Sequence, residues 1–293
     1  MSEFSTYDYV PGGDPRQRLD VFAPGPAADD LRTAVLVLHG GAFRFGDRAV
    51  VHPRCQALAA RGFTAITAGY RLLDTAAWPA QLDDARAAVR WVQAHAGELG
   101  VDAGRIVVQG HSAGAHLALL LAGGAGAGRP DAAGDAGPLP ALAAVATYYP
   151  PVALSLTPGA GEVSAQAILG PDATTGEAEA ASPVSYVGGQ FPPTVLLHGT
   201  ADRLIPPAAS LRFYDALTAA GVTAELHLIA GQDHEFDMTP RYTRIASDLV
   251  AGFLRAQVIE PEQVAKEVLE SNPLASMPPP ELGPVTPAAA DGT

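Results

Sequence analysis

Cysteine is nearly absent from this chain of 293 residues, in which Cys55 stands alone. A single cysteine excludes a disulfide bond within the chain and also excludes a zinc site made from several cysteines. Long apolar runs are missing as well, since none approaches the roughly 18 residues of a membrane-spanning helix. The first residues contain neither a basic segment nor an apolar core, so we recognise no signal peptide and expect a cytoplasmic protein.

Basic residues are scarce relative to acidic ones. The sequence has 18 lysines and arginines against 31 aspartates and glutamates, which gives a formal net charge of −13. This balance disfavours nucleic acids and anionic membrane surfaces, because their phosphates would repel the protein. A small neutral substrate is compatible with it. We therefore expect no nucleic acid partner and no integral membrane association, while the oligomeric state stays open.

The pattern of apolar residues predicts the α/β class. Short apolar runs alternate with longer alanine-rich stretches in which apolar residues recur at helical spacing. Such alternation predicts a mostly parallel central sheet of about eight strands with helices on both faces. Residues 17–22 alternate polar and apolar side chains instead, which suits an antiparallel edge strand. The predicted strands lie at 33–39, 63–68, 105–109, 142–148, 194–198 and 223–229, and the helices at 55–60, 80–95, 113–122, 163–169, 210–220 and 242–257.

Residues 1–258 are expected to form one α/β domain, in which two segments break the rhythm. Residues 123–141 are rich in glycine and predict a flexible surface loop. Residues 150–193 contain one short helical patch and form either a small lid or a long connection. The segment 259–293 is different, because it begins with a short acidic helix at 261–271 and continues as a proline- and alanine-rich tail that we expect to be disordered.

A serine lies between two glycines at the end of one predicted strand. The sequence GHSAG at 110–114 follows the apolar run 105–109 and precedes a helical stretch. Small residues around a serine allow a sharp turn from strand to helix, with the serine at its tip in strained backbone. Strain of this kind tends to occur where a side chain is used, so Ser112 is the candidate nucleophile.

An acid and a histidine follow later strands at the same edge of the predicted sheet. Asp202 comes after the strand at 194–198 and His234 after the strand at 223–229, so the order is serine, acid, histidine. A serine hydroxyl needs a base to take its proton, histidine can be that base, and a carboxylate fixes the histidine tautomer. The rival acids are Asp233 and Asp237, and the rival histidines, to which we assign structural roles, include His39, His111, His116 and His198.

A glycine-rich loop supplies the remaining part of the predicted site. The sequence HGGAF at 39–43 follows another predicted strand. The oxyanion of a tetrahedral intermediate needs preorganised hydrogen-bond donors, which the backbone amide of Ala113 and the amides of this loop can provide. The candidate donors are Gly40, Gly41, Ala42 and Ala113, and the candidate substrate-lining residues, each of which also suits the core, are Phe43, Tyr70, His111 and Phe236.

In this combination and order, the motifs resemble those of serine esterases of the α/β-hydrolase fold. The chain is similar to carboxylesterases and acetylesterases with HGG-A/G-F/W, GxSxG and a late Asp–His pair, a group related to hormone-sensitive lipase. The similarity extends from about residue 17 to about residue 257 and includes the stretches LDVFAP, WPAQLDDARAAVRWV and PPTVLLHGTADRLIP. The resemblance implies the α/β-hydrolase fold and hydrolysis of an ester without a metal or cofactor.

Three features separate the chain from the hormone-sensitive-lipase branch. Ala42 stands where that branch usually has glycine, although alanine still offers its amide. Only 32 residues precede the strand at 33–39, too few for a helical N-terminal cap. The tripeptide at 69–71 is Gly-Tyr-Arg, where relatives often have Asn or Asp before the tyrosine. The chain is therefore closer to compact, lightly capped esterases that resemble acetyl-xylan esterases, feruloyl esterases or kynurenine formamidases.

These observations favour a serine hydrolase that cleaves carboxylic esters with short acyl chains through an acyl-enzyme. An arylformamidase or small amidase with the same residues is the first alternative. A non-catalytic hydrolase fold that binds a ligand is the second, although such proteins usually lose the serine or the histidine. A peptidase of the prolyl-oligopeptidase kind would normally bring a large additional domain, which is missing here.

Overall fold

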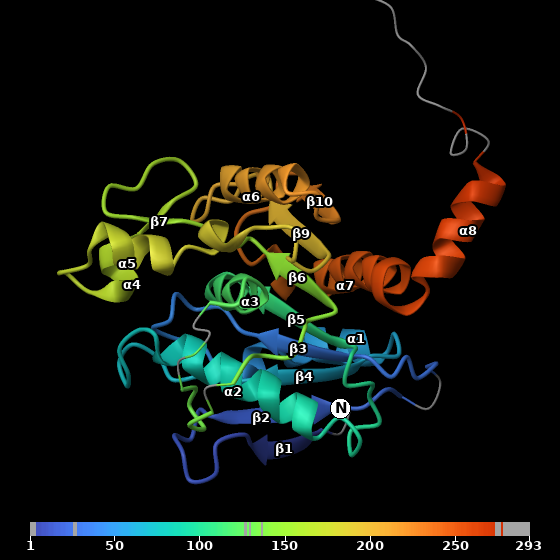
Figure 1. Cartoon of the computed structure of the whole chain (residues 1–293), viewed down its shortest axis with the longest axis horizontal. Coiled ribbons are helices and arrows are strands. Elements are labelled where there is room, and N and C mark those ends of the chain that lie inside the picture. The colour runs from blue at the N-terminus through green and yellow to red at the C-terminus, as the bar shows by residue number, and fades with distance from the viewer. Residues whose placement is uncertain are drawn as a thin grey trace, which may run out of the picture. The chain divides into compact units, whose positions relative to one another are not determined.

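An eight-stranded sheet forms the centre of the computed structural model, which describes residues 4–25, 28–125, 128, 130–135, 137–272 and 277. The strand order is β1-β2-β4-β3-β5-β6-β9-β10, from bottom to top in Figure 1. β1 and β4 both pair antiparallel with β2, and all other neighbours are parallel. The strands are β1 (Ser5–Asp8), β2 (Arg18–Phe22), β3 (Ala34–Leu38), β4 (Thr64–Ala68), β5 (Ile106–His111), β6 (Ala144–Tyr148), β9 (Thr194–Gly199) and β10 (Ala224–Ile229).

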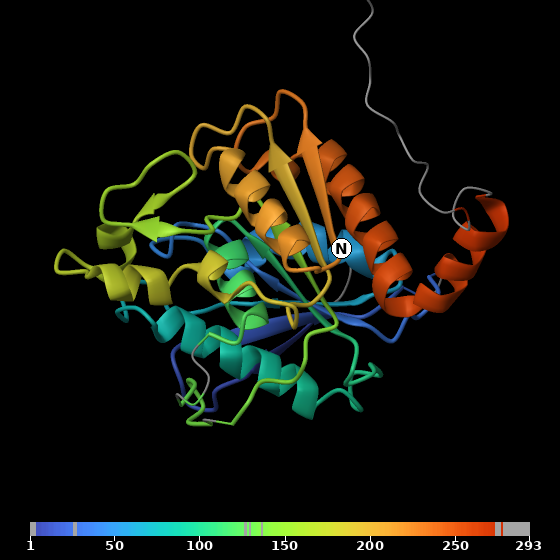
Figure 2. The same ribbon diagram turned by 45° about the horizontal axis from the view of Figure 1, so that its top comes forward.

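The central strands are apolar on both sides because helices cover both faces of the sheet. In β3 every residue is buried. Leu36 and Leu38 belong to one apolar cluster and Val35 and Val37 to the other, since successive side chains point to opposite faces. The first cluster lies under α2 (Ala80–Ala94), α3 (Ala113–Ala122) and α6 (Ala208–Ala219), and the second under α1 (His52–Ala59) and α7 (Pro240–Leu254), as Figure 2 shows. The predicted α/β architecture is confirmed.

The edge of the sheet differs from the prediction. Residues 17–22 do form an antiparallel strand, β2, but β1 pairs with its outer side, so β2 is not the edge. β1 (Ser5–Asp8) is exposed along its whole length and carries no apolar alternation. A strand without a buried face leaves no periodic signal in the sequence, which explains why it was missed.

The segment 150–193 is more structured than predicted. It contains a two-stranded sheet, two short helices and one turn of 3₁₀ helix, which lie at the left of Figure 1. Thr174 and Glu177 form a capping box at the start of α5, a Thr-x-x-Glu signal that is readable in the sequence. The elements are β7 (Leu154–Ser155), β8 (Val163–Ser164), α4 (Ala165–Leu169), α5 (Thr175–Ala180) and η2 (Pro183–Tyr186).

Part of the segment 123–141 is held by a buried ion pair. Arg90 on α2 places its Nε 2.8 Å from a carboxylate oxygen of Asp131, which is buried. Asp131 also accepts hydrogen bonds from the amides of Ala133 and Asp135. These bonds connect the described residues around Asp131 to α2, while residues 133–135 are exposed, so the flexible surface loop stays a prediction.

The chain divides into two compact units, residues 1–259 and 260–293. The first unit ends with a short π-helix, Arg255–Ile259, that continues α7. In the second, α8 (Pro261–Ser271) begins with proline, which agrees with the helix expected at 261–271. Most of the expected disordered tail, 272–293, lies outside the described residues. Where the structure is described, none of the helices combines the length and apolarity that crossing a membrane requires.

The close approach of β3, β5 and α3 gives a first prediction. A Cβ added to Gly114 would lie 2.2 Å from the carbonyl oxygen of Leu38, which is backbone and cannot swing away. Gly114→Ala should therefore lower the free energy of unfolding by about 3 kcal/mol. Gly252→Ala is the matched control: its Cβ meets nothing within 4 Å, and alanine should stabilise α7 by about 1 kcal/mol. Urea unfolding measures both, and equal effects of the two substitutions would contradict the steric argument.

Candidate active site

Ser112 lies in the sharp turn between β5 and α3. Its φ of +52° and ψ of −116° belong to a region that L-residues rarely adopt. Glycine on both sides is required by space, because a Cβ on Gly110 would lie 2.2 Å from the Gly114 carbonyl oxygen. The turn therefore holds the Ser112 side chain at the carboxyl end of β5, where it is only 7% exposed.

The structure brings Ser112, His234 and Asp202 together in one chain of hydrogen bonds. The Nε2 atom of His234 lies 3.0 Å from Oγ of Ser112, and its Nδ1 atom lies 2.7 Å from Oδ2 of Asp202. The three residues follow β5, β9 and β10, whose carboxyl ends meet at one edge of the sheet. The predicted residues thus stand at distances suited to proton transfer from the serine to the histidine.

Asp202 is held in one orientation from several sides. Its Oδ1 atom accepts hydrogen bonds from the amides of Leu204 and Ile205, at 2.9 and 2.8 Å. Its Oδ2 atom faces Nε2 of His198 at 3.3 Å, in addition to His234. Burial alone would raise the pKa of Asp202, but hydrogen bonds from His198, His234 and Ile205 hold it well below its usual value. The carboxylate therefore stays charged in the mildly acidic range.

His198 contributes more to this arrangement than the sequence suggested. It is fully buried, and its Nδ1 atom lies 2.7 Å from Oγ of Ser210. Its Nε2 atom donates to the carbonyl of Ile205 at 2.8 Å, which fixes the tautomer. The predicted structural role fits these bonds, but its contact with Asp202 also connects it to the candidate catalytic acid.

The HGGAF loop passes directly over Ser112. A Cβ on Gly40 would lie 3.2 Å from Cβ of Ser112, and Gly41, Ala42 and Phe43 have φ values of +117°, +51° and +60°. The amides of Gly41 and Ala42 meet no acceptor within the described parts of the chain. The amide of Ala113 belongs to the first turn of α3, where helix amides have no partner within the helix. The loop and the helix therefore present free donors near the serine.

His39 braces this loop from behind. Its Nδ1 atom donates to the Gly40 carbonyl at 2.6 Å, and its ring stacks on Tyr70 with centroids 4.3 Å apart. The Tyr70 hydroxyl in turn donates to the His39 carbonyl at 2.8 Å. Burial lowers the pKa of His39 to about 4 although the bond to Gly40 opposes the shift. The histidine is thus neutral near pH 7 and keeps the tautomer that holds the loop.

The four candidate substrate-lining residues lie mainly in the interior. Phe43, Tyr70 and Phe236 are at most 5% exposed, and their surfaces are already covered by neighbouring aromatic rings. These rings support the loops to which they belong, and they have no open face toward a substrate. His111 is buried too, yet it lines a cavity beside Gly40 and Gly41. A substrate-lining role is therefore disfavoured for Phe43, Tyr70 and Phe236. For His111 it stays a prediction.

A buried charged cluster, which sequence reasoning did not find, lies behind the histidine loop. Asp237 binds Nε of Arg54 at 2.5 Å, the Tyr149 hydroxyl at 2.6 Å and Nδ1 of His111 at 3.1 Å. Tyr149 also packs its ring on His234, with centroids 4.4 Å apart. Burial opposes ionisation of Asp237, but the hydrogen bond from His111 and the charge and hydrogen bond of Arg54 hold its pKa well below the usual value. The cluster joins α1, the serine turn and the histidine loop.

Asp233, the other rival acid, points away from the candidate site. Its carboxylate binds Nη2 of Arg203 at 2.5 Å and accepts hydrogen bonds from the amides of Arg203 and His234. These bonds lower the pKa of Asp233 to about 2 and fix the loop, while the His234 ring turns to Asp202. The choice of Asp202 over Asp233 and Asp237 agrees with this geometry.

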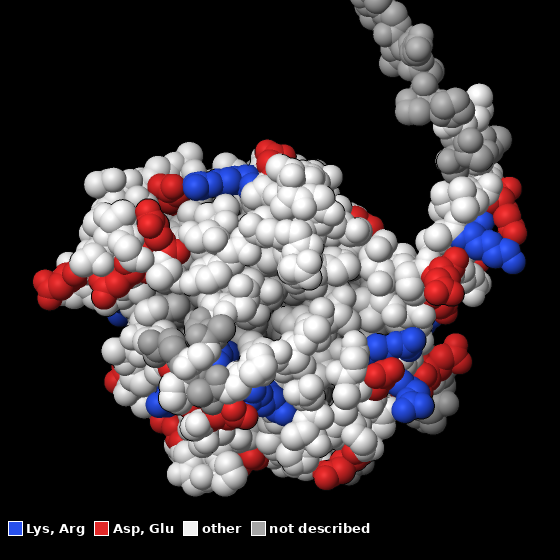
Figure 3. Space-filling model, in the orientation of Figure 1, with Lys and Arg blue, Asp and Glu red and all other residues white. Residues whose placement is uncertain are grey.

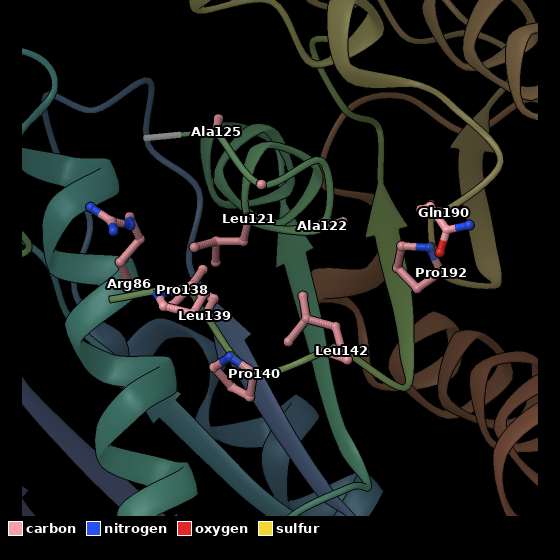
Figure 4. A pocket seen from close by; sticks show the side chains of 12 residues that line it. Arg86, Leu121, Ala122, Ala125, Pro138, Leu139, Pro140, Leu142, Gln190 and Pro192 are labelled. Atoms are coloured by element: carbon pink, nitrogen blue, oxygen red, sulfur yellow. The ribbon is translucent and has the colours of Figure 1, made fainter. Parts of the chain in front are cut away.

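Two cavities must be distinguished. One of about 200 Å³ lies against the HGGAF loop and is lined by Gly40, Gly41 and Glu235 among others. Another, of about 310 Å³, lies between α2, α3 and residues 138–142, with Leu121 and Leu139 in its wall (Figure 4). Leu142 and Pro192, which line this second cavity, come just before β6 and β9. The cavity therefore lies at the amino ends of the strands. The candidate residues follow the carboxyl ends, so only the first cavity belongs to the site.

On the face of the molecule shown in Figure 3, charged residues do not gather into a second candidate site. On the face shown in Figure 3, lysine and arginine side chains lie singly or in small groups near acidic ones. Nowhere among the described residues are three His, Cys, Asp or Glu side chains grouped as a metal site would need.

Buried neutral histidines give a prediction about pH. His116 donates from Nδ1 to the Pro151 carbonyl at 3.0 Å, and burial lowers its pKa to about 4 despite this bond. Between an unfolded pKa of about 6.5 and this value, the unfolded chain binds one proton more than the folded protein. Stability contributed by His116 is therefore complete above pH 6.5 and lost as the pH falls toward 4.

His116→Gln should remove this contribution. The slope of the unfolding free energy against pH between 4.5 and 6 should decrease by about 1.4 kcal/mol per pH unit relative to the wild type. Urea titrations at several pH values measure it. Equal slopes would mean that the folded protein carries a charged His116, contrary to its buried position.

Comparison with known proteins places the chain in a family. The sequence model of the BD-FAE family matches residues 19–217. The chain belongs to the BD-FAE family. The matched range contains Ser112 and Asp202, and His234 follows it. The family assignment agrees with the resemblance to α/β-hydrolase esterases.

The relatives of this BD-FAE protein include esterases. Esterase LipQ of Mycobacterium tuberculosis is 30% identical over 269 residues, which are 86% of this chain and 62% of LipQ. The chain therefore spans about three fifths of that relative. Among solved structures, a thermophilic esterase of Thermogutta terrifontis is 28% identical with a TM-score of 0.71, over 86% of this chain and 91% of that one. An acetyl ester-xyloside bifunctional hydrolase from Caldicellulosiruptor lactoaceticus is 26% identical with a TM-score of 0.71, over 86% and 96%.

Proposed function

We propose that this protein is a carboxylic ester hydrolase that works through an acyl-enzyme on Ser112. The observation that carries the proposal is the hydrogen-bonded series Ser112, His234 and Asp202 at the strained turn. The esterase relatives support the same reaction. A non-catalytic binding protein would not require a strained serine within hydrogen-bond distance of an oriented histidine.

The geometry suggests the following steps. Nε2 of His234 takes the proton of the Ser112 hydroxyl while Oγ attacks the ester carbonyl carbon, and Asp202 stabilises the resulting imidazolium. The carbonyl oxygen becomes an oxyanion that accepts hydrogen bonds from the amides of Ala113 and Gly41, with Ala42 or Gly40 as further donors. The intermediate collapses, the bond to the alcohol oxygen breaks, and His234 returns the proton to that oxygen. Water repeats the sequence on the acyl-enzyme and releases the carboxylic acid.

We propose short acyl chains as the preferred ones. Three aromatic rings, Phe43, Trp78 and His116, pack against one another, and His116 lies one turn beyond Ser112 on α3. Phe43 and His116 are at most 1% exposed, so these two rings leave no open space between them, whereas Trp78 is partly exposed and lines a cavity of about 300 Å³. A long chain on that side of the serine would have to displace packed rings, which costs more than its burial would contribute.

Hydrolysis of p-nitrophenyl esters from acetate to palmitate tests the proposal, with Ser112→Ala as control. We expect turnover of acetate or butyrate, a steep fall with longer chains, and no activity in the variant. A faster reaction with an aryl formamide than with aryl acetates would favour the formamidase alternative. If the wild type cleaves none of these substrates, the remaining hypothesis is a non-catalytic protein that binds a ligand.

A further inference from the structure

The cavity beside the serine has one charged residue that the proposed chemistry does not use. The cavity holds about 200 Å³, and its wall combines the apolar side chains of Phe45, Val50 and Met238 with Tyr149 and Glu235. Glu235 directly follows His234 in the sequence and has a φ of +55°. The left-handed backbone lets the chain turn immediately after the histidine, so residue 235 stays at the site.

The carboxylate of Glu235 and the side chain of Ser112 both lie against Gly40. The Oε1 atom of Glu235 is 3.6 Å from the point where a Cβ on Gly40 would stand, and Cβ of Ser112 is 3.2 Å from the same point. Glu235 is exposed to solvent, and within the described parts of the chain it makes no ion pair. A free carboxylate beside the reacting serine will act on any charge that a substrate carries there.

No other charge in the cavity wall compensates Glu235. Arg54 also lines the cavity, but its guanidinium is bound to the buried carboxylate of Asp237. His111 contributes no charge near pH 7, because burial lowers its pKa although Asp237 opposes the shift. The electrostatic potential at the mouth of the cavity is therefore negative, in line with the acidic whole molecule.

The alcohol part of an ester is the part that meets this charge. In the proposed mechanism, on which this inference rests, His234 gives a proton to the leaving oxygen, so the alcohol lies on the histidine side of Ser112. Glu235 and Met238 of the histidine loop form that side of the cavity. We propose that Glu235 makes the enzyme selective for esters of cationic alcohols of the quaternary ammonium type, whose methyl groups suit the apolar wall.

Two acetate esters of the same shape test the proposal. Acetylcholine has a positively charged nitrogen where 3,3-dimethylbutyl acetate has a neutral carbon. The ratio of kcat/KM for acetylcholine to kcat/KM for the neutral ester therefore isolates the effect of the charge. In the wild type this ratio should exceed one and decrease with added salt, because salt screens exposed charges. Glu235→Gln keeps the shape of the side chain and should lower the ratio by about two- to fivefold, the range expected for an exposed ion pair.

Glu98→Gln is the matched control, since it removes the same charge from an exposed position before β5, at the opposite edge of the sheet. Its ratio should equal that of the wild type. An unchanged ratio in Glu235→Gln, or the same decrease in both variants, would overturn the proposal. Failure of the esterase function itself is distinguished by the neutral ester: if 3,3-dimethylbutyl acetate and p-nitrophenyl acetate are both inert, the reaction is wrong, and if they are cleaved, the ratio decides on Glu235.

Discussion

Ser112→Ala and His234→Ala should each lower kcat for p-nitrophenyl acetate by about 10⁴-fold or more, and the double variant should be no slower than the slower single variant. The physical reason is that Oγ and Nε2, 3.0 Å apart, act as one unit. Without the serine the histidine has no hydroxyl to activate, and without the histidine the hydroxyl keeps its proton. Residual activity should come from the amide donors near Gly41 and Ala113 alone.

The decisive measurement is kcat of the four proteins under the same conditions, with circular dichroism to show that each is folded. Additive losses, in which the double variant is slower by the product of both factors, would mean that Ser112 and His234 do not cooperate in one step. Full activity of Ser112→Ala would exclude the acyl-enzyme.

Ser112→Gly separates catalysis from stability at the same position. Serine at φ +52° stores backbone strain that glycine does not have. The glycine variant should be as inactive as the alanine variant but more stable than the wild type by about 1 kcal/mol. A less stable glycine variant would contradict the idea that the turn is strained to serve the reaction.

Local patterns explain which parts of this molecule could be predicted. The buried strands β3, β4 and β9 each appear as short apolar runs, and Gly110 of the GHSAG turn is required by a contact with Gly114, four residues away. β1 was missed since its exposed residues have no periodicity, and β7 and β8 are only two residues long. Prediction from sequence thus succeeded where burial or sterics left a local trace.

The buried cluster behind the site illustrates what a sequence does not display. The bond between Tyr149 and Asp237 joins residues 88 positions apart, and that between Arg54 and Asp237 joins residues 183 apart. None of these three residues stands in a motif, and each pair exists only because α1, the end of β6 and the histidine loop pack together. Glu235 was overlooked for a similar reason, since its nearness to Gly40 depends on two distant loops.

Substitution of Asp202 by asparagine should also cause a large loss of kcat. Its Oδ2 atom accepts the Nδ1 proton of His234 at 2.7 Å, which leaves Nε2 free to accept the serine proton. In Asp202→Asn the amide group can donate toward Nδ1, which favours the tautomer with its proton on Nε2 and removes the base. We expect kcat to fall by about 10⁴-fold with a small change in KM. Because the pKa of Asp202 lies well below its usual value, protonation of this residue does not set the acid limb of the wild-type rate.

His198 provides a graded comparison on the same carboxylate. It faces Oδ2 at 3.3 Å and is held by Ser210 and the Ile205 carbonyl, so it positions Asp202 without touching the substrate. His198→Gln should reduce kcat by about tenfold, leave KM unchanged, and cost little further activity in the Asp202→Asn background, because the orientation it supports is already lost. Steady-state kinetics of the two single variants and the double variant measure this coupling. Independent, multiplicative effects would show that His198 supports the fold near β9 and not the orientation of Asp202.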